Sequence, residues 1–182
     1  MKKIIITLTI ILSCNLFADS SNGRVALHDS VYNEEYKLTR TLLENGANTE
    51  ARTKAGLTPL HIAIKKRDLE MAAILLEFGA NINAQDNRQN SSLIVAVKKK
   101  NIDLVRFLVL NHADVNLPND EGITPLHQAS YSGNPTIVEF LLDTGADNTM
   151  KSNQGYSAFD FAIMQNNLSI IDVLKIYERE RK

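Results

Sequence analysis

The 182-residue sequence has no tryptophan, four prolines and a single cysteine. A lone cysteine cannot close an internal disulfide, so the fold has to be held by its packed core. Hydrophobic residues make up 44% and charged residues 23% of the chain, which are ordinary values for a globular protein and not for a disordered one. The composition therefore predicts one folded domain without covalent cross-links.

Charge of one sign and long apolar runs are also missing. The formal net charge is −1, which disfavours a globally basic nucleic-acid-binding protein and requires any basic patch to be local. The apolar run from Ile4 to Leu12 covers about nine residues, well short of the roughly 20 that a helix needs to cross a bilayer. No later segment comes closer, so the sequence predicts no transmembrane helix.

The N-terminal segment MKKIIITLTIILSCNLFA has the layout of a secretory signal peptide, with a positive start, an apolar run and a small residue, Ala18, before a polar segment. We predict a signal peptide over residues 1–18 and a mature chain of residues 19–182, exported by a bacterium to the periplasm or secreted. In the alternative, the tetrapeptide ILSC that ends at Cys14 resembles a bacterial lipobox, and a lipid on Cys14 would anchor the protein to a membrane. The apolar residues that follow Cys14 are unusual for a lipoprotein tether.

Several landmarks recur in the sequence with a single period of about 33 residues, a length typical of repeat proteins. The leucine of the segment TPLH, Leu60, is matched at this step by Leu27, Leu93, Leu126 and Phe159. An apolar pair of residues also recurs at this step. A Gly-Ala dipeptide follows each pair, except in the third repeat, where His-Ala takes its place. Independent landmarks that share one period predict an array of five structural repeats.

The sequence pattern of each repeat predicts the same local structure, a pair of helices followed by a turn-rich segment. A Thr-Pro pair places proline in the first turn of a helix, and the apolar segment after it supplies a buried face. An Asp or Asn then caps a second amphipathic helix, which ends at a left-handed glycine before a turn-rich segment. The predicted caps of the second helices are Asp68, Asn101, Asn134 and Asn167, and the predicted terminal glycines are Gly46, Gly79 and Gly145.

The segments GLTPLHIAI and LLEFGANINA, and again GITPLHQAS and LLDTGADN, resemble ankyrin repeats. The resemblance covers essentially the whole mature chain and implies an all-α ankyrin-repeat solenoid of stacked helix-turn-helix units with projecting hairpin loops. One unit cannot bury its apolar face alone, and at least about three are needed for stability, so five suffice. The predicted repeats are about 20–52, 53–85, 86–118, 119–151 and 152–182.

Catalysis has little support in the sequence. The motifs G-x-S-x-G, H-E-x-x-H and G-x-x-x-x-G-K-[ST] are absent. His28, His61 and His127 lie on helices that would pack about 8–10 Å apart, whereas zinc needs nitrogens at about 2.0–2.1 Å. The family resemblance implies that these histidines brace turns by hydrogen bonds. We therefore predict a non-enzymatic protein without cofactor or metal, and keep as a remote alternative a hydrolase whose carboxylates come from distant loops.

The resemblance also implies where a partner would bind, because family members use the hairpin tips and the exposed ends of the first helices on a concave face. Two basic triplets, residues 65–67 and 98–100, fall at these helix ends and would form one basic stripe. Glu34 is expected on the outer surface, away from this row. The predicted partner-binding residues are Tyr32, Lys65, Lys66, Arg88, Lys98, Lys99, Tyr131, Ser132 and Met164.

Three interpretations of the basic stripe stay open. It could be a solvated face that keeps the protein soluble, a docking surface for an acidic protein, or a site for an anionic polymer or lipid headgroup. The predicted function is an exported, monomeric adaptor that binds a protein of unknown identity through its concave face, with no nucleic acid involved. The anionic-ligand binder is the alternative.

The third repeat departs most from the pattern. Gln89 stands where the other repeats have glycine, Ser91 and Ser92 replace Thr-Pro, and His112 replaces the terminal glycine. A side chain forced into a left-handed backbone conformation costs roughly 1 kcal/mol, so we predict that this repeat is locally the weakest. In the first repeat Thr39 takes a usually apolar place, and we predict that it belongs to a polar terminal cap.

Overall fold

The computed structural model describes residues 25–180, which form ten helices in five pairs. These residues contain no strand, only isolated bridges such as the antiparallel one between Lys151 and Ser157. The all-α prediction is therefore confirmed. The chain divides into two compact units, one that ends at Asn87 and one that begins at Arg88. The predicted signal peptide and lipobox lie outside the described residues.

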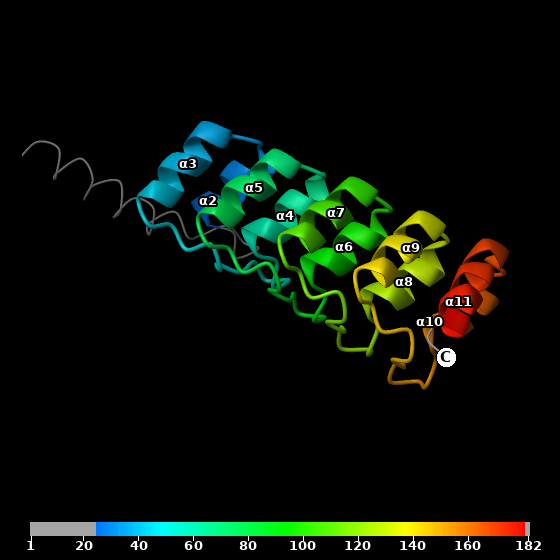
Figure 1. The fold of residues 1–182 in the computed structure, drawn as a ribbon. Coiled ribbons are helices and arrows are strands. Elements are labelled where there is room, and N and C mark those ends of the chain that lie inside the picture. Colours follow the sequence, from blue (N-terminus) through cyan, green and yellow to red (C-terminus); the bar gives the residue numbers. More distant parts are fainter. Residues whose placement is uncertain (1–24, 181–182) are drawn as a thin grey trace, which may run out of the picture. The chain divides into compact units, whose positions relative to one another are not determined.

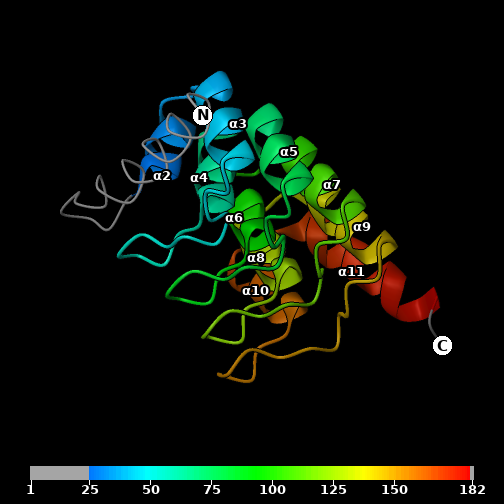
Figure 2. The same cartoon turned by 90° about the vertical axis from the view of Figure 1, so that its left-hand side faces the viewer.

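The first unit holds two helix pairs (Figure 1). Helix α2 (Ala26–Tyr32) packs on α3 (Tyr36–Glu44), α4 (Pro59–Lys66) packs on α5 (Leu69–Glu77), and α2 also packs on α4. Leu27 and Leu60, one period apart, are at most 1% exposed, as expected for leucines at the centre of stacked repeats. The loop between α3 and α4 extends away from the helices (Figure 2).

The second unit holds three helix pairs. The inner helices α6, α8 and α10 pack on one another in that order, and the outer helices α7, α9 and α11 do the same. The loops between α7 and α8 and between α9 and α10 extend to one side of the unit (Figure 2). The six helices are α6 (Ser92–Lys98), α7 (Ile102–Leu110), α8 (Pro125–Ser132), α9 (Pro135–Asp143), α10 (Ala158–Met164) and α11 (Leu168–Glu180).

Most helices begin where the sequence predicts. Pro59 and Pro125 open α4 and α8, and the threonine before each accepts a hydrogen bond from the backbone of the third helical residue. Asp68, Asn101 and Asn134 cap α5, α7 and α9 through their side chains. Asn167, the predicted cap of α11, directly precedes that helix, and its side-chain amide donates to the carbonyl oxygen of Ser130 at 2.9 Å.

The first turn of α6 differs from those of α4 and α8, because Ser92 takes the place of proline. The Oγ atom of Ser91 caps this helix by accepting from the backbone N–H of Ile94 at 3.3 Å. Ser92 is fully buried, and its hydroxyl has no hydrogen-bond partner among the described residues. A buried hydroxyl without a partner is destabilising, so this turn is a weak point of the third repeat.

The third repeat also carries the two left-handed side chains that the sequence predicts. Gln89 has φ of 55° and His112 has φ of 68°, in the region that glycine adopts at Gly56, Gly122 and the helix-terminal positions. The left-handed backbone predicted at Gln89 and His112 is therefore confirmed.

A glycine and an asparagine join successive hairpin tips in the first unit. The backbone N–H of Asn87 donates to the carbonyl oxygen of Ala55 at 3.2 Å, and its side-chain amide donates to that of Lys54 at 2.8 Å. A Cβ atom on Gly56 would lie 2.3 Å from Oδ1 of Asn87, closer than any stable contact. Only glycine leaves room for this arrangement, which we call the Gly–Asn clasp.

The second unit repeats the clasp at the next tips. Asn153 donates through its backbone to the carbonyl oxygen of Glu121 at 3.0 Å and through its side chain to that of Asp120 at 2.9 Å. A Cβ atom on Gly122 would lie 2.6 Å from Oδ1 of Asn153. The clasp is absent where Gln89 replaces the glycine. There the place of the asparagine is taken by Asp120, whose side chain has no donor. Only the backbone N–H of Asp120 bonds to the preceding hairpin, by donating to the carbonyl oxygen of Arg88 at 3.2 Å.

One end of the array differs from the expected polar cap, and the other agrees with it. Thr39, which was predicted to belong to a polar terminal cap, is instead fully buried, and its hydroxyl donates to Oγ of Ser30 at 2.9 Å. The two buried hydroxyl groups meet each other's hydrogen-bonding requirement at a place where other repeats pack apolar groups. At the other end, α11 is 13 residues long and carries exposed Lys175, in agreement with a polar cap. Within residues 25–180, no helix is both long and apolar enough to cross a membrane.

Candidate binding surface

The predicted partner-binding residues of the first unit lie at the ends of α2 and α4. Tyr32 is 50% exposed, and Lys65 and Lys66 are exposed in the last turn of α4. The ammonium group of Lys66 lies 2.9 Å from a carboxylate oxygen of Glu34 and 4.9 Å from the centroid of the Tyr32 ring. The hydrogen bond with Glu34 raises the pKa of Lys66 above its ordinary value.

This contact corrects the expected position of Glu34, which belongs to the same row as Lys66 and not to a remote outer surface. Its carboxylate offsets part of the positive charge predicted there. The pair is exposed to solvent, which screens it, so it contributes little to stability. Lys65 and Arg67 are also exposed at the end of α4.

In the second unit the predicted lysines lie at the end of α6, and Arg88 is exposed on the hairpin before it. The ammonium group of Lys98 donates to Oδ1 of Asn90 at 3.0 Å. Asn90 is buried and also accepts from the side chain of Asn119 at 3.2 Å. Lys98 therefore has a structural role that its sequence position did not predict, while Lys99 is exposed after the last helical turn.

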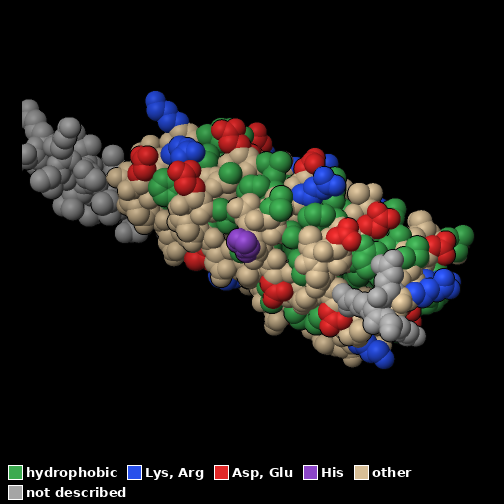
Figure 3. Space-filling view, in the orientation of Figure 1, with side chains coloured by type: hydrophobic (Ala, Val, Ile, Leu, Met, Phe, Trp, Pro, Cys, Tyr) green, Lys and Arg blue, Asp and Glu red, His purple; other side chains and the backbone are tan. Residues whose placement is uncertain are grey.

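Both lysine pairs thus occupy the exposed helix ends that the repeat register predicts. Lys65 and Lys66 belong to the first unit and Lys98 and Lys99 to the second. Their union into one basic stripe stays a prediction. Figure 3 shows one face of the molecule, on which acidic and basic side chains are scattered among apolar and other polar ones.

The remaining predicted residues lie at the ends of α8 and α10. Tyr131 and Met164 are each 52% exposed. Ser132 is only half-buried, and its hydroxyl accepts a hydrogen bond from the side-chain amide of Gln128 at 3.0 Å. Tyr131 and Met164 therefore present the larger contact area, while Ser132 positions a neighbouring side chain.

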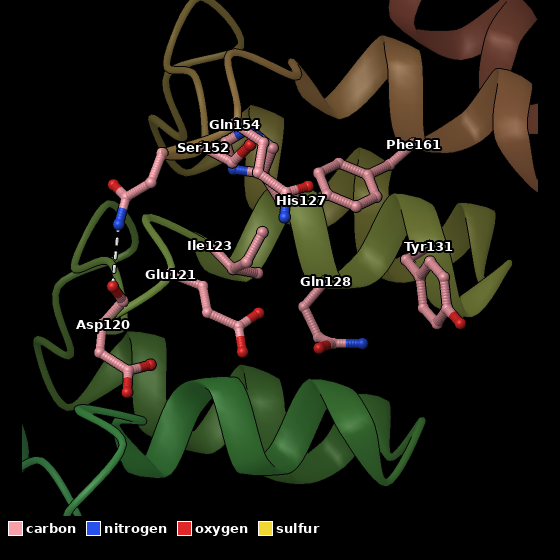
Figure 4. Close-up of a pocket in the computed structure, with 10 residues that line it drawn as sticks. Asp120, Glu121, Ile123, His127, Gln128, Tyr131, Ser152, Gln154 and Phe161 are labelled. Atoms are coloured by element: carbon pink, nitrogen blue, oxygen red, sulfur yellow. Dashed lines mark hydrogen bonds between the residues drawn. The ribbon is translucent and has the colours of Figure 1, made fainter.

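A pocket of about 370 Å³ opens next to Tyr131 in the second unit (Figure 4). Hairpin residues form one side and the inner helices α8 and α10 form the other. In Figure 4 the carboxylate of Glu121 and the carboxamide of Gln128 point the same way, with the ring of Tyr131 beyond them. The lining residues are Asp120, Glu121, Ile123, His127, Gln128, Tyr131, Ser152, Asn153, Gln154 and Phe161.

Phe161 is the centre of an aromatic cluster at this pocket. Its ring meets those of His127, Tyr131 and Tyr156 edge to face, with centroid distances of 5.6, 6.2 and 6.2 Å. Such contacts fix ring orientation and add to the energy of burial. In a chain with only 6% aromatic residues, this concentration beside an open pocket marks the site.

The histidines brace turns, as the family resemblance implies. The ring of His127 accepts a hydrogen bond from the backbone N–H of Thr124 at 3.2 Å through Nδ1, and Nε2 donates to the carbonyl oxygen of Tyr156 at 3.1 Å. Burial lowers the pKa of His127 below its ordinary value, so the ring is neutral at pH 7. His28 donates in the same manner to the carbonyl oxygen of Ala51 at 3.0 Å.

Of the residues that line the pocket, the sequence identified Tyr131, but not the pocket itself. Phe161 takes the register position of Gln128, one repeat earlier. This register position was not among the predicted partner-binding positions, although the repeat period shows that Phe161 occupies it. Among residues 25–180 there is no group of three or more His, Cys, Asp or Glu side chains placed to hold a metal ion.

Comparison with known proteins agrees with the repeat assignment. A family model described as ankyrin repeats (3 copies) matches residues 3–86 and 93–180. The first match begins inside the segment for which the sequence predicts a signal peptide. A search of curated proteins gave no significant match.

Proposed function

Because the chain belongs to the ankyrin repeat family, whose members generally mediate protein–protein interaction, we propose that it is an adaptor that binds a protein partner through its inner helix ends and hairpin tips. The observation that carries the proposal is the exposure of Tyr32 and Tyr131, each about half exposed at the end of the first helix of its pair. Tyrosine is favoured at binding hot spots.

The proposal is binding and not catalysis. A general base needs a ring nitrogen that can reach a substrate proton. In His127 both ring nitrogens are used, one by Thr124 and one by Tyr156. In His28 one nitrogen accepts from Val25 and the other donates to Ala51. The buried histidines thus support a rigid scaffold that presents other side chains.

An acidic protein is the partner that the exposed lysines favour, and an anionic polymer or lipid headgroup is the second candidate. We expect the double variant Lys65→Glu/Lys99→Glu to slow association with a partner recovered by crosslinking, most strongly at low salt. Lys66 and Lys98 are left unchanged because replacing them would also break their contacts with Glu34 and Asn90. The control, Lys37→Glu/Lys175→Glu, makes the same charge change on outer helices α3 and α11.

Two results decide between the candidates. Stoichiometric capture of one protein that survives physiological salt supports the adaptor, whereas binding to heparin resin or anionic vesicles that disappears at that salt supports generic charge attraction. Equal association rates for both double variants would contradict a role for the lysines. Full affinity after Tyr32→Ala and Tyr131→Ala would contradict the binding surface itself.

We also propose that the protein is exported, with cleavage after Ala18, to the periplasm or the medium. The support is the layout of the segment that ends at Ala18. The mass of the native protein tests it, because a chain that starts at Asp19 differs from one that starts at an acylated Cys14. A mass that includes Met1 would contradict both forms of export, and would fit a family match that starts at residue 3.

A further inference from the structure

We propose that the pocket of the second unit receives an arginine side chain of the protein partner. The guanidinium group would lie between the carboxylates of Asp120 and Glu121 and the rings of Tyr131 and Phe161. The inference rests on the proposed function, since the arginine belongs to a bound protein segment. It assigns the pocket a charge preference opposite to that of the lysines at the helix ends.

The shape of the pocket suits one long side chain. Its volume of about 370 Å³ lies at the lower end of the roughly 300–1,000 Å³ typical of ligand sites. Ile123 and Phe161 supply apolar surface, and the mouth is open toward solvent. An arginine stem can cover such apolar surface while its head stays near polar groups.

The aromatic side of the pocket is already in place before any ligand binds. Three edge-to-face contacts hold the ring of Phe161, one of them with Tyr131. Tyr131 keeps 52% of its surface exposed. A guanidinium within about 6 Å of an aromatic ring is attracted to it, and a preformed ring loses little freedom when the cation arrives.

The hairpin side of the pocket supplies negative charge without a counter-ion. Asp120 and Glu121 are exposed, and neither carboxylate forms an ion pair or accepts a hydrogen bond among the described residues. Their backbone is nevertheless fixed, because Asn153 donates to both carbonyl oxygens. The side-chain amide of Gln128 donates to Ser132, so its oxygen remains able to accept from a ligand.

Arginine fits these groups better than lysine does. Its planar head stacks on aromatic rings and donates in parallel to a carboxylate, whereas the lysine ammonium is a compact and strongly hydrated point charge. The buried ring of His127 is neutral and does not oppose a cation. A partner segment that also contacted Lys99 would carry an acidic residue outside the pocket.

The test is an NMR titration of the full chain with N-acetyl-arginine N-methylamide, and in parallel with its uncharged isostere, N-acetyl-citrulline N-methylamide. We expect saturable shifts confined to the pocket, at His127, Tyr131 and Phe161, with binding in the millimolar range expected of a fragment. The citrulline compound should bind at least about fivefold more weakly, since it cannot pair with a carboxylate. Equal binding of the two compounds would overturn the charge assignment.

Matched variants complete the test. Glu121→Gln should weaken arginine binding about fivefold, whereas Glu139→Gln makes the same change on α9 outside the pocket and should leave it unchanged. Equal effects of the two, or shifts spread over the surface, would overturn the proposal. A partner that still binds in a Lys65- and Lys99-dependent manner would then show that the adaptor function stands without the arginine pocket.

Discussion

Replacing Ser92 by proline should stabilise the protein, because the buried hydroxyl at the start of α6 has no partner among the described residues. Leaving such a group unsatisfied costs about 1–3 kcal/mol. Proline at a compatible position adds about 0.4–1 kcal/mol by restricting the unfolded chain. The bulk of the ring offsets part of this gain if the surrounding side chains must move. We expect a net gain of about 1–2 kcal/mol in the free energy of unfolding.

The backbone is already suited to the change. Ser91 has φ of −76° and ψ of 163°, close to Thr58 at −81° and 166° and to Thr124 at −81° and 167°. Both threonines precede a proline, which requires an extended residue before it. The prolines at these two places are buried, so the repeat accommodates the ring.

Urea unfolding followed by circular dichroism measures the effect. With a slope of roughly 2 kcal/mol per molar urea, the midpoint should rise by about 0.5–1 M. Ser92→Ala removes the hydroxyl without adding the ring and should give a smaller gain. Ser91→Ala, which removes the helix cap next to it, should lower the midpoint. If neither change at Ser92 raised the midpoint, the hydroxyl would not be a source of instability and the reasoning would fail.

Two further effects follow from the same contacts. Gly122→Ala should lower stability by about 2 kcal/mol more than Gly155→Ala, because both glycines are left-handed but only a Cβ on Gly122 meets Asn153; equal urea midpoints for the two variants would refute the clasp. Burial lowers the pKa of His127, so the unfolded chain binds more protons below pH 6.5 and stability should fall with pH below that value, toward the folded pKa. His127→Gln should flatten this fall between about pH 7.5 and 5.5 relative to the exposed control His112→Gln, and an unchanged pH profile would contradict the assignment.

The repeat register predicted most of the fold. Leu27, Leu60, Leu93 and Leu126 are all buried, as their shared place in successive repeats requires. The left-handed backbone at Gln89 was also predicted from the sequence, because glycine occupies this position in other repeats and glycine adopts a positive φ without steric cost. Positions that depend on backbone and core packing therefore follow from the sequence.

Contacts between side chains of different elements did not follow from it. Thr39 is buried because Ser30 supplies a hydroxyl partner, and Glu34 meets Lys66 although the two belong to different repeats. The pocket likewise forms only where Phe161 of one repeat meets Tyr131 and His127 of another. Register fixes the location of each residue along the array, but the pairing of two side chains depends on the identity of both.

The Gly–Asn clasp has a consequence for how such an array can change its length. Each clasp is divided between two repeats, since Gly122 belongs to one and Asn153 to the next. A recombination event that deleted residues 119–151 would keep the period intact but bring Asn153 to the place of Asp120, against the side chain of Gln89. Such a deletion would leave the spacing of the repeats unchanged. It would nevertheless create a steric clash between Gln89 and Asn153 at the new junction. The two residues of a clasp therefore have to be inherited together across the boundary between repeats, and one repeat cannot be exchanged for another without regard to its neighbour.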